Sequence, residues 1–385
     1  MECEAKIWQK SDYLIVVMKP VKVGGAKGGS KSAFSQSKAQ VTQEVTKKVA
    51  KELRGIRHQS KTYKKVANTC GQYQGTAPQT NSKKAVGVDG VTKTDYGENL
   101  DESVDNLIAR MKKFSYKPQP VRRAFIPKAD GRMRPLGIPS YEDRLVQGVM
   151  AVVLNNIYEE RFLDCFYGFR PNRSAHQAVR EINQTIMTRK VNYVLEADIK
   201  GFFDNVNHDW LMKFLEHDIA DKYFLRYVKR FLIAGVMDGT QRQESDKGSP
   251  QGGQISPVLA NVYLHYVLDL WFVHELKKQC RGEVYYVRYA DDFVIMFQYE
   301  NEAGQAMEML KTRLAKFGLE VAEDKTRTLP IGRFKGTKES FDFLGFTFYN
   351  IKTRTGKHRM GVKTSKSKLK VKKQTVKAWL KTRLI

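Results

Sequence analysis

The chain has 385 residues, of which 41% are hydrophobic and 11% aromatic, so its composition is that of a globular protein long enough for more than one domain. Its 67 lysines and arginines outnumber 41 aspartates and glutamates, which leaves a net charge of +26 at pH 7. So large a cationic surplus favours a polyanionic partner, with nucleic acid as the first candidate and an anionic membrane surface as the second. No apolar run approaches the roughly 20 residues that span a bilayer, so a membrane protein is not expected.

The cysteines argue against two further classes of protein. They are far apart and form no Cys-x-x-Cys pair, which disfavours both a zinc knuckle and a disulfide framework. This usage fits a reducing compartment, and we expect a cytoplasmic protein that binds nucleic acid. The four cysteines are Cys3, Cys70, Cys165 and Cys280.

Residues 1–86 are basic and are predicted to be weakly structured. Gly24 to Ser32 is rich in Gly, Ser and Lys, the composition of a flexible linker. The Lys-rich stretch Gln43 to Arg57 has a few spaced apolar residues and is compatible with a short helix. Two interpretations stay open for this extension, a basic arm that touches RNA or DNA and a disordered leader that keeps the protein soluble.

Regular patterns begin at Gly87. Apolar residues at helical spacing predict helices, and runs rich in β-branched and aromatic residues predict strands. Interleaved helices and antiparallel hairpins indicate an α+β fold rather than a doubly wound parallel sheet. The predicted elements are a helix at 101–111, strands at 121–127 and 134–139, helices at 141–162 and 174–187, a strand at 191–199, helices at 209–215, 223–233 and 256–278, a hairpin at 284–297, a helix at 302–317, and strands near 319–321 and at 341–349.

The hairpin carries two adjacent acids, Asp291 and Asp292, between the apolar runs Val284 to Arg288 and Phe293 to Phe297. Aspartate is depleted in strands but common in turns, so the pair is expected at the hairpin tip. Adjacent carboxylates repel each other and raise each other's pKa unless a cation neutralises them. An acidic surface turn is the simpler interpretation of an isolated Asp-Asp. The apolar flanks favour a site for Mg²⁺, a cation that prefers oxygen ligands.

A second acidic position, Asp198, ends the predicted strand 191–199 and is followed by Gly201, Phe202 and Phe203. A carboxylate buried without a partner costs several kcal/mol, so Asp198 is a poor core residue. Placed beside Asp291, it would complete a site for two Mg²⁺ ions, which activate an attacking hydroxyl and neutralise charge on a displaced phosphate.

A glycine-rich loop, Gly248 to Pro257, lies between these acidic segments. Its glycines allow close approach of the backbone to a ligand, and Ser256 with Pro257 fits the start of a helix. A plain helix-capping loop would explain Ser256 and Pro257 but not the clustered Pro-Gln-Gly-Gly before them.

Asp198 with its aromatic residues, the Ser-Pro-Gln-Gly loop and Tyr-Ala-Asp-Asp, in this order, resemble the core motifs of reverse transcriptases. More narrowly, the chain resembles the proteins encoded by bacterial group II introns. The resemblance runs from about Gly87 to Phe348. Further motifs that carry it are Gly87 to Thr92, Arg134 to Pro139, Gly168 to Ser174, Gly248 to Pro257 and Phe343 to Phe346.

The resemblance implies a role for each matching residue. Asp198, Asp291 and Asp292 are expected to be catalytic, and Lys325 to protonate the pyrophosphate leaving group. Phe203 is similar to the aromatic gate that rejects a ribose 2′-OH. The implied metal ligands, which would hold two Mg²⁺ ions with Mn²⁺ able to substitute, are Asp198, Ile199, Asp291 and Asp292. The implied dNTP-binding residues are Lys128, Arg134, Phe203, Gln251 and Ile199. The implied primer grip is Phe343, Leu344, Gly345 and Phe346.

The resemblance also implies a right-hand polymerase fold, with fingers at 87–199, palm at 200–350 and the start of a thumb at 351–385. Asp198 at the fingers–palm border belongs to the active site. Only the first thumb helix, Lys363 to Leu384, is expected here, and no zinc-type Cys/His cluster or HNH endonuclease signature is present. The Lys-rich stretch from Lys352 onward is interpreted either as a helix with a phosphate-facing stripe or as a solvated basic tail.

The implied function is RNA-directed DNA synthesis, a nucleotidyl transfer onto the 3′-OH of a DNA or RNA primer. The implied partners are an RNA template or intron RNA, the primer and dNTPs. Two alternatives stay open, an RNA-binding maturase with weak or no polymerase activity and a retron or defence-type reverse transcriptase. The diversity-generating enzymes rank low, because the loop with Gln251 and Ser256 differs from theirs.

Overall fold

The computed structural model describes residues 85–127, 133–244, 246–249, 252–332, 334–335 and 337–383. They form two compact units that interleave along the chain. Unit 1 holds the described part of Met1–Ile126 with Pro135–Glu160 and Asn207–Leu259, and unit 2 holds Pro127–Arg134, Arg161–Val206 and Ala260–Ile385. The predicted basic arm, with its linker and short helix, lies outside the described residues apart from 85 and 86.

Unit 1 is mainly helical, and the predicted helices 101–111, 141–162, 209–215 and 223–233 are confirmed within it. On α4 the apolar residues Val104, Leu107 and Ile108 form the buried face, as the helical spacing predicts. The helices are α3 (Lys93–Glu98), α4 (Leu100–Lys112), α5 (Tyr141–Tyr158), α8 (His208–Asp218) and α9 (Lys222–Leu232).

Short strands accompany these helices in a four-stranded sheet of order β2-β1-β4-β5. The predicted neighbouring strands β1 (Val121–Pro127) and β2 (Met133–Ile138) are confirmed. β4 (Val236–Asp238) and β5 (Gln241–Gln243) were not predicted, because three residues are too few to show a strand pattern.

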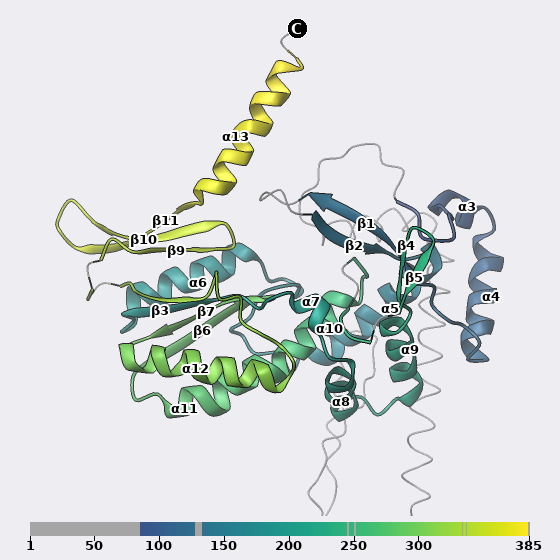
Figure 1. Cartoon of the computed structure of the whole chain (residues 1–385), viewed down its shortest axis with the longest axis horizontal. Helices are drawn as coiled ribbons and strands as arrows, with labels where there is room; N and C mark the ends of the chain where they lie inside the picture. Colours follow the sequence, from purple (N-terminus) through teal and green to yellow (C-terminus); the bar gives the residue numbers. More distant parts are fainter. Residues whose placement is uncertain are drawn as a thin grey trace, which may run out of the picture. The chain divides into compact units, whose positions relative to one another are not determined.

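Unit 2 is built on an antiparallel sheet of order β6-β7-β3-β8. The strands are β3 (Tyr193–Ala197), β6 (Val284–Tyr289), β7 (Asp292–Phe297) and β8 (Arg327–Pro330). The helix α6 (Ala175–Thr188) covers one face, and α12 (Glu300–Lys316) covers the other (Figure 1). Because both faces are covered, β7 is buried from Phe293 to Phe297, which explains its unbroken apolar run.

A second antiparallel sheet, of order β11-β10-β9, packs on the other side of α6. The sequence predicted one strand at 341–349, and this was wrong: β9 (Ser340–Phe343) and β10 (Phe346–Lys352) are separate strands joined by a tight turn. The strand near 319–321 is also wrong, because Val321 forms only an isolated bridge with Ile199. The strand β11 (His358–Thr364) was not predicted.

The long apolar helix predicted at 256–278 is present but not uniform. It begins as α10 (Ser256–Leu264), widens into two π-helical segments, His265–Asp269 and Phe272–Leu276, and ends as α11 (Lys277–Gln279). Such π-helical turns inside an α-helix are rare and frequently mark functional positions.

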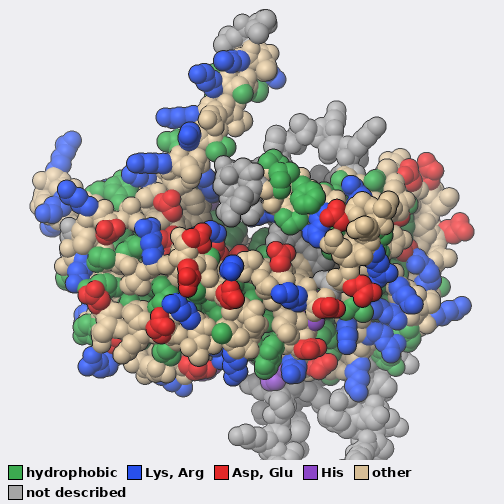
Figure 2. Space-filling model, in the orientation of Figure 1, with side chains coloured by type: hydrophobic (Ala, Val, Ile, Leu, Met, Phe, Trp, Pro, Cys, Tyr) green, Lys and Arg blue, Asp and Glu red, His purple; other side chains and the backbone are tan. Residues whose placement is uncertain are grey.

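The last described helix is α13 (Lys366–Lys381), which begins three residues later than the predicted Lys363 because that residue belongs to β11. None of its residues is buried, and Figure 2 shows Lys and Arg side chains projecting from this segment at the top of the view. No helix among the described residues is long and apolar enough to cross a bilayer.

Candidate active site

The acidic pair lies at the tip of the β6–β7 hairpin, as the sequence predicts. Tyr289 pairs with Asp292 across the hairpin, so Ala290 and Asp291 form a two-residue loop. Ala290 has φ of 57°, in the left-handed region that a residue with a Cβ rarely adopts. Two-residue hairpin loops of the favoured types require a positive φ at their first residue, so this conformation allows the tight turn that carries Asp291.

Asp198 reaches this tip through the pairing of β3 with β7. The register places Ala197 opposite Phe293, and continuing it by one residue places Asp198 opposite Asp292. The two acidic segments that the sequence analysis singled out separately are therefore neighbours at one edge of the sheet.

The three carboxylates influence one another electrostatically. Partial burial, followed by repulsion from Asp198, raises the pKa of Asp291, and the positive charges of Arg134 and Lys325 oppose that rise. Partial burial and the charges of Asp291 and Asp198 raise the pKa of Asp292 to about 7. Asp292 as a whole residue is exposed, so solvent weakens this effect. The cluster carries more negative charge than its protein neighbours neutralise.

Lys325 forms an ion pair with the carboxylate of Asp198. The loop that carries it is held beside Asp198, because the Ala322 amide donates to the Asp198 carbonyl over 2.8 Å and the Lys200 amide donates to the Glu320 carbonyl over 2.9 Å. The hydrogen bond from Lys325 to Asp198 raises the pKa of the lysine, which therefore stays protonated at neutral pH.

Phe203 follows Asp198 on the four-residue helix α7 (Phe202–Asn205). Gly201 caps this helix with φ of 53°, a conformation that favours glycine. Phe202 is buried against Tyr263 and meets the Phe203 ring edge-on at 5.4 Å, so the second ring rests on a fixed neighbour and remains partly exposed.

The four residues of the predicted primer grip form the turn between β9 and β10. Leu344 and Gly345 both have positive φ, 51° and 78°, as a two-residue hairpin turn requires. Phe343 is buried in the core of unit 2. The turn contacts the start of α13, since Lys368 donates to the Leu344 carbonyl over 3.0 Å and the Ser365 amide donates to the Gly345 carbonyl over 3.0 Å.

Two predicted dNTP-binding residues, Lys128 and Gln251, lie outside the described residues. Within the described ranges, no three His, Cys, Asp or Glu side chains are arranged closely enough to enclose a metal ion. Asp198 is instead paired with Lys325. The donor set nevertheless suits a hard divalent cation, because it consists of carboxylates whose mutual repulsion a cation would relieve.

A buried ion pair that was not predicted from the sequence lies next to the hairpin tip, between Arg288 on β6 and Asp269 at the end of the first π-helical segment. Both side chains are fully buried. A signal was available, because a charged residue inside an apolar strand or helix run needs a buried partner of opposite charge.

Comparison with known proteins identifies the family of this chain. A family profile described as "Reverse transcriptase (RNA-dependent DNA polymerase)" matches residues 126–348. The Protein YkfC of Escherichia coli is 32% identical over 304 residues, which cover 71% of this chain and 78% of YkfC. The Group II intron-encoded protein LtrA of Lactococcus lactis is 33% identical over 334 residues, which cover 72% of this chain and 53% of LtrA.

A more distant relative is the Nuclear intron maturase 2, mitochondrial, of Arabidopsis thaliana, 25% identical over 51% of this chain and 30% of the relative. The chain thus spans about half the length of LtrA. The family profile covers more than half of the chain and includes Asp198, Asp291, Asp292 and Lys325. The chain belongs to the reverse transcriptase family, in the group that includes group II intron-encoded proteins and intron maturases.

Proposed function

We propose that the chain is an RNA-directed DNA polymerase, which extends a primer 3′-OH with dNTPs on an RNA template. The observation that carries this proposal is the register of β3 with β7, which brings Asp198 beside Asp292 and the Asp291 loop. An acidic cluster of this kind needs a cation at neutral pH, and nucleotidyl transfer needs cations between carboxylates and phosphates.

Asp198 and Asp291 would hold two Mg²⁺ ions, with the Ile199 carbonyl as a further ligand and Asp292 as a supporting carboxylate. When bound, these ions supply charge neutralisation for the triphosphate and a lowered pKa for the primer hydroxyl. The protein prepares the site by fixing Asp198 at the end of β3 and Asp291 in the two-residue loop. Mn²⁺ has the same preference for oxygen ligands and would substitute.

The remaining residues act on the nucleotide. Lys325, protonated and beside Asp198, can donate a proton to the pyrophosphate as it leaves. Arg134, together with Lys128, would neutralise the triphosphate. The Phe203 ring would collide with a ribose 2′-OH, and Gln251 would contact the sugar and base of the incoming nucleotide.

We assign the fingers to residues 87–199 and the palm to residues 200–350, with Asp198 at their border; all three aspartates belong to one compact unit, unit 2, which supports a shared active site. The turn at Phe343 to Phe346 would grip the primer. The exposed, Lys-rich α13, whose first turn contacts this hairpin turn, would begin the thumb and follow the phosphate backbone of the bound duplex.

An RNA-binding maturase is the second candidate, and the names of two relatives favour it: one is a "Nuclear intron maturase" and another is "Group II intron-encoded". In this role the same basic surfaces would bind intron RNA for splicing, and DNA synthesis would be weak or absent. A carboxylate cluster of raised pKa is costly to maintain in a purely RNA-binding protein, so we rank the polymerase first.

Primer extension decides between the two candidates. The purified chain is incubated with an RNA template, an annealed DNA primer and dNTPs in the presence of Mg²⁺ or of EDTA. We expect extension that requires Mg²⁺. Retained binding of a group II intron RNA without extension in either Mg²⁺ or Mn²⁺ would favour the maturase and contradict the polymerase.

A further inference from the structure

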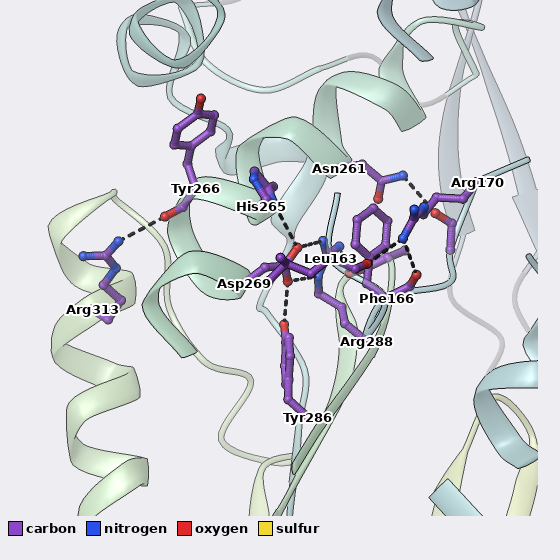
Figure 3. Close-up of polar contacts among 12 residues, drawn as sticks. Leu163, Phe166, Arg170, Asn261, His265, Tyr266, Asp269, Tyr286, Arg288 and Arg313 are labelled. Carbon is purple, nitrogen blue, oxygen red and sulfur yellow. Dashed lines mark hydrogen bonds and ion pairs between the residues drawn. The ribbon is translucent and has the colours of Figure 1, made fainter. Parts of the chain in front are cut away.

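Arg288 is fully buried on β6, one residue before the hairpin tip. Its guanidinium meets the Asp269 carboxylate along one edge, with Nε 2.7 Å from Oδ1 and Nη2 bonded to Oδ2 (Figure 3). Tyr286 donates its hydroxyl to the same carboxylate over 3.1 Å. This bidentate geometry fixes the plane of the guanidinium as well as its position.

The remaining Nη1 of Arg288 reaches the hairpin tip. It donates to the carbonyl of Ala290 over 3.0 Å, and Ala290 is the residue with φ of 57°. Since a residue with a Cβ rarely adopts this conformation, surrounding contacts must hold it. The charged hydrogen bond from Arg288 is such a contact, and it joins Asp269 directly to the loop that presents Asp291.

A second element, the segment Cys165 to Gly168, also contacts this loop. The segment Cys165 to Gly168 runs along the end of β6: the Arg288 amide donates to the Cys165 carbonyl over 3.0 Å, and the Tyr167 amide donates to the Arg288 carbonyl over 2.9 Å. A Cβ on Gly168 would lie 2.4 Å from the Ala290 amide nitrogen, so only glycine fits there. Asn261 donates to the Gly168 carbonyl over 2.8 Å.

The carboxylate that pairs with Arg288 belongs to a π-helical segment. Asp269 is the last residue of the π-helical segment His265–Asp269. Burial alone would raise the pKa of Asp269, but the charge of Arg288 and the proximity of His265 outweigh burial and lower it. The charge of Asp269 likewise overcomes burial and raises the pKa of Arg288. Both groups therefore stay ionised, and the pair is a permanent charged contact rather than a pH switch.

We propose that Asp269 and Arg288 are positioning residues for catalysis: the buried pair sets the Tyr289–Asp292 loop, and thereby Asp291, for metal-assisted nucleotidyl transfer. This inference rests on the proposed polymerase function. The pair lies behind the loop, so its contribution is to the geometry of the carboxylates and not to contact with substrate. The first π-helical segment ends at Asp269, so this local widening of the helix positions the carboxylate that pairs with Arg288.

The test uses variants of the full chain that keep the size of each side chain. Arg288→Lys keeps the charge but cannot bond Asp269 and the Ala290 carbonyl at once, and Asp269→Asn keeps the shape but removes the charge. Tyr286→Phe removes only the hydroxyl that orients Asp269, which guards against a failure of the other two to fold. Glu302→Gln is the matched control, because this buried carboxylate accepts from the Arg281 and Gly282 amides before the start of β6.

Two readouts separate positioning from general stability. In primer extension we expect Arg288→Lys and Asp269→Asn to lower kcat by about 10- to 100-fold, the scale expected for a misplaced catalytic group, while the KM for dNTP changes little. In hydrogen exchange of the folded variants we expect faster exchange at 289–292 with unchanged exchange in α12. Tyr286→Phe should show the same pattern more weakly, and Glu302→Gln should not show it.

Unchanged kcat and unchanged exchange at 289–292 in folded Arg288→Lys and Tyr286→Phe would overturn the proposal. An equal loss of kcat in Glu302→Gln would overturn the proposal too, because the loss would then follow from removing any buried charge and not from the Asp269–Arg288 pair. The exchange readout needs no activity. A wild-type chain that extends no primer would therefore contradict the proposed function, while exchange at 289–292 would still decide whether the pair sets the loop.

Discussion

Lys325 forms an ion pair with Asp198, although 127 positions separate the two residues along the chain. The Asp198 side chain is 15% exposed and the Lys325 side chain 54%, so the lysine approaches a largely shielded carboxylate from the solvent side. A divalent cation at Asp198 would compete with this contact. Once the cation separates Lys325 from Asp198, the protonated lysine would lie beside the triphosphate, where the leaving pyrophosphate needs a proton donor.

Lys325→Ala should therefore slow nucleotide incorporation by about 100-fold, within the range found for a positioned general acid. The KM for dNTP should change much less, because the lysine acts on the leaving group. Single-nucleotide extension under single-turnover conditions measures this rate. Lys200→Ala is the matched control, since Lys200 pairs with Glu320 on the same two segments and should extend at the wild-type rate. Equal losses in the two variants would remove the special role of Lys325.

Phe203→Val should accept ribonucleotides more readily, with a loss of discrimination of about 1–3 kcal/mol, the scale of rejection by shape. The partly exposed ring rests on buried Phe202, so shortening it opens space without disturbing the core. The ratio of kcat/KM for a dNTP to that for the matching rNTP is the measurement. Phe203→Tyr keeps the bulk and should keep the ratio. Unchanged selectivity in the valine variant would show that another residue is the gate.

The raised pKa of Asp292, about 7 against 3.8 for an ordinary aspartate, predicts a pH dependence of stability in metal-free protein. The folded state binds this proton more tightly than the unfolded state, so between about pH 4 and pH 7 its contribution to stability falls as pH rises. Asp292→Asn should therefore be more stable than wild type near pH 8 in EDTA, and the difference should shrink toward about pH 5. Solvent exposure of Asp292 keeps the effect small.

Denaturant unfolding of the two proteins at both pH values measures this difference. A gap in the free energy of unfolding that is constant with pH would mean that Asp292 titrates normally. Added Mg²⁺ should stabilise the wild type more at the higher pH, because a cation binds the ionised carboxylates.

The lysines of α13 should contribute to binding of nucleic acid through phosphate contacts. Replacing Lys373 and Lys377 by Gln should reduce the slope of log K against log salt concentration by about 1–2, since each phosphate contact contributes about 0.7–0.9. Lys277 and Lys278 on α11 are also exposed and serve as the control pair. Fluorescence anisotropy with an RNA–DNA duplex at several salt concentrations gives both slopes. Identical slopes would favour the interpretation of α13 as a solvated basic tail.

The elements predictable from the sequence are those with a strong local pattern. The tip at Asp291 and Asp292 was predictable because two apolar runs flank it, and both runs are strands. The helix start at Ser256 was predictable from its Ser-Pro pair. From the sequence, Asp198 could be assigned to the same site only through the resemblance to a family. The pairing of β3 with β7 joins segments about a hundred residues apart, so no local pattern predicts it.

Other features could not be predicted for identifiable reasons. The turn at Leu344 and Gly345 lies within a run of aromatic residues with high strand propensity, and a single glycine in such a run does not distinguish a turn from a bulge; the positive φ of both residues reveals the turn. The charges of Asp269 and Arg288 within apolar runs each signal a buried partner, but the sequence does not show that they pair with each other, because the π-helical segment that places Asp269 has no distinctive side-chain periodicity. Each residue looked like an isolated charge in an apolar run until the fold brought them together.

The most direct test of the central claim is primer extension by Asp291→Ala, compared with wild type at equal occupancy of the RNA template. Asp291 occupies the two-residue loop, and its replacement removes a proposed metal ligand from a partly exposed turn rather than from the core. We predict that the variant binds the template as wild type does and yields no extended primer in Mg²⁺. Extension at a rate near that of wild type would contradict the assignment of this carboxylate cluster as the polymerase active site.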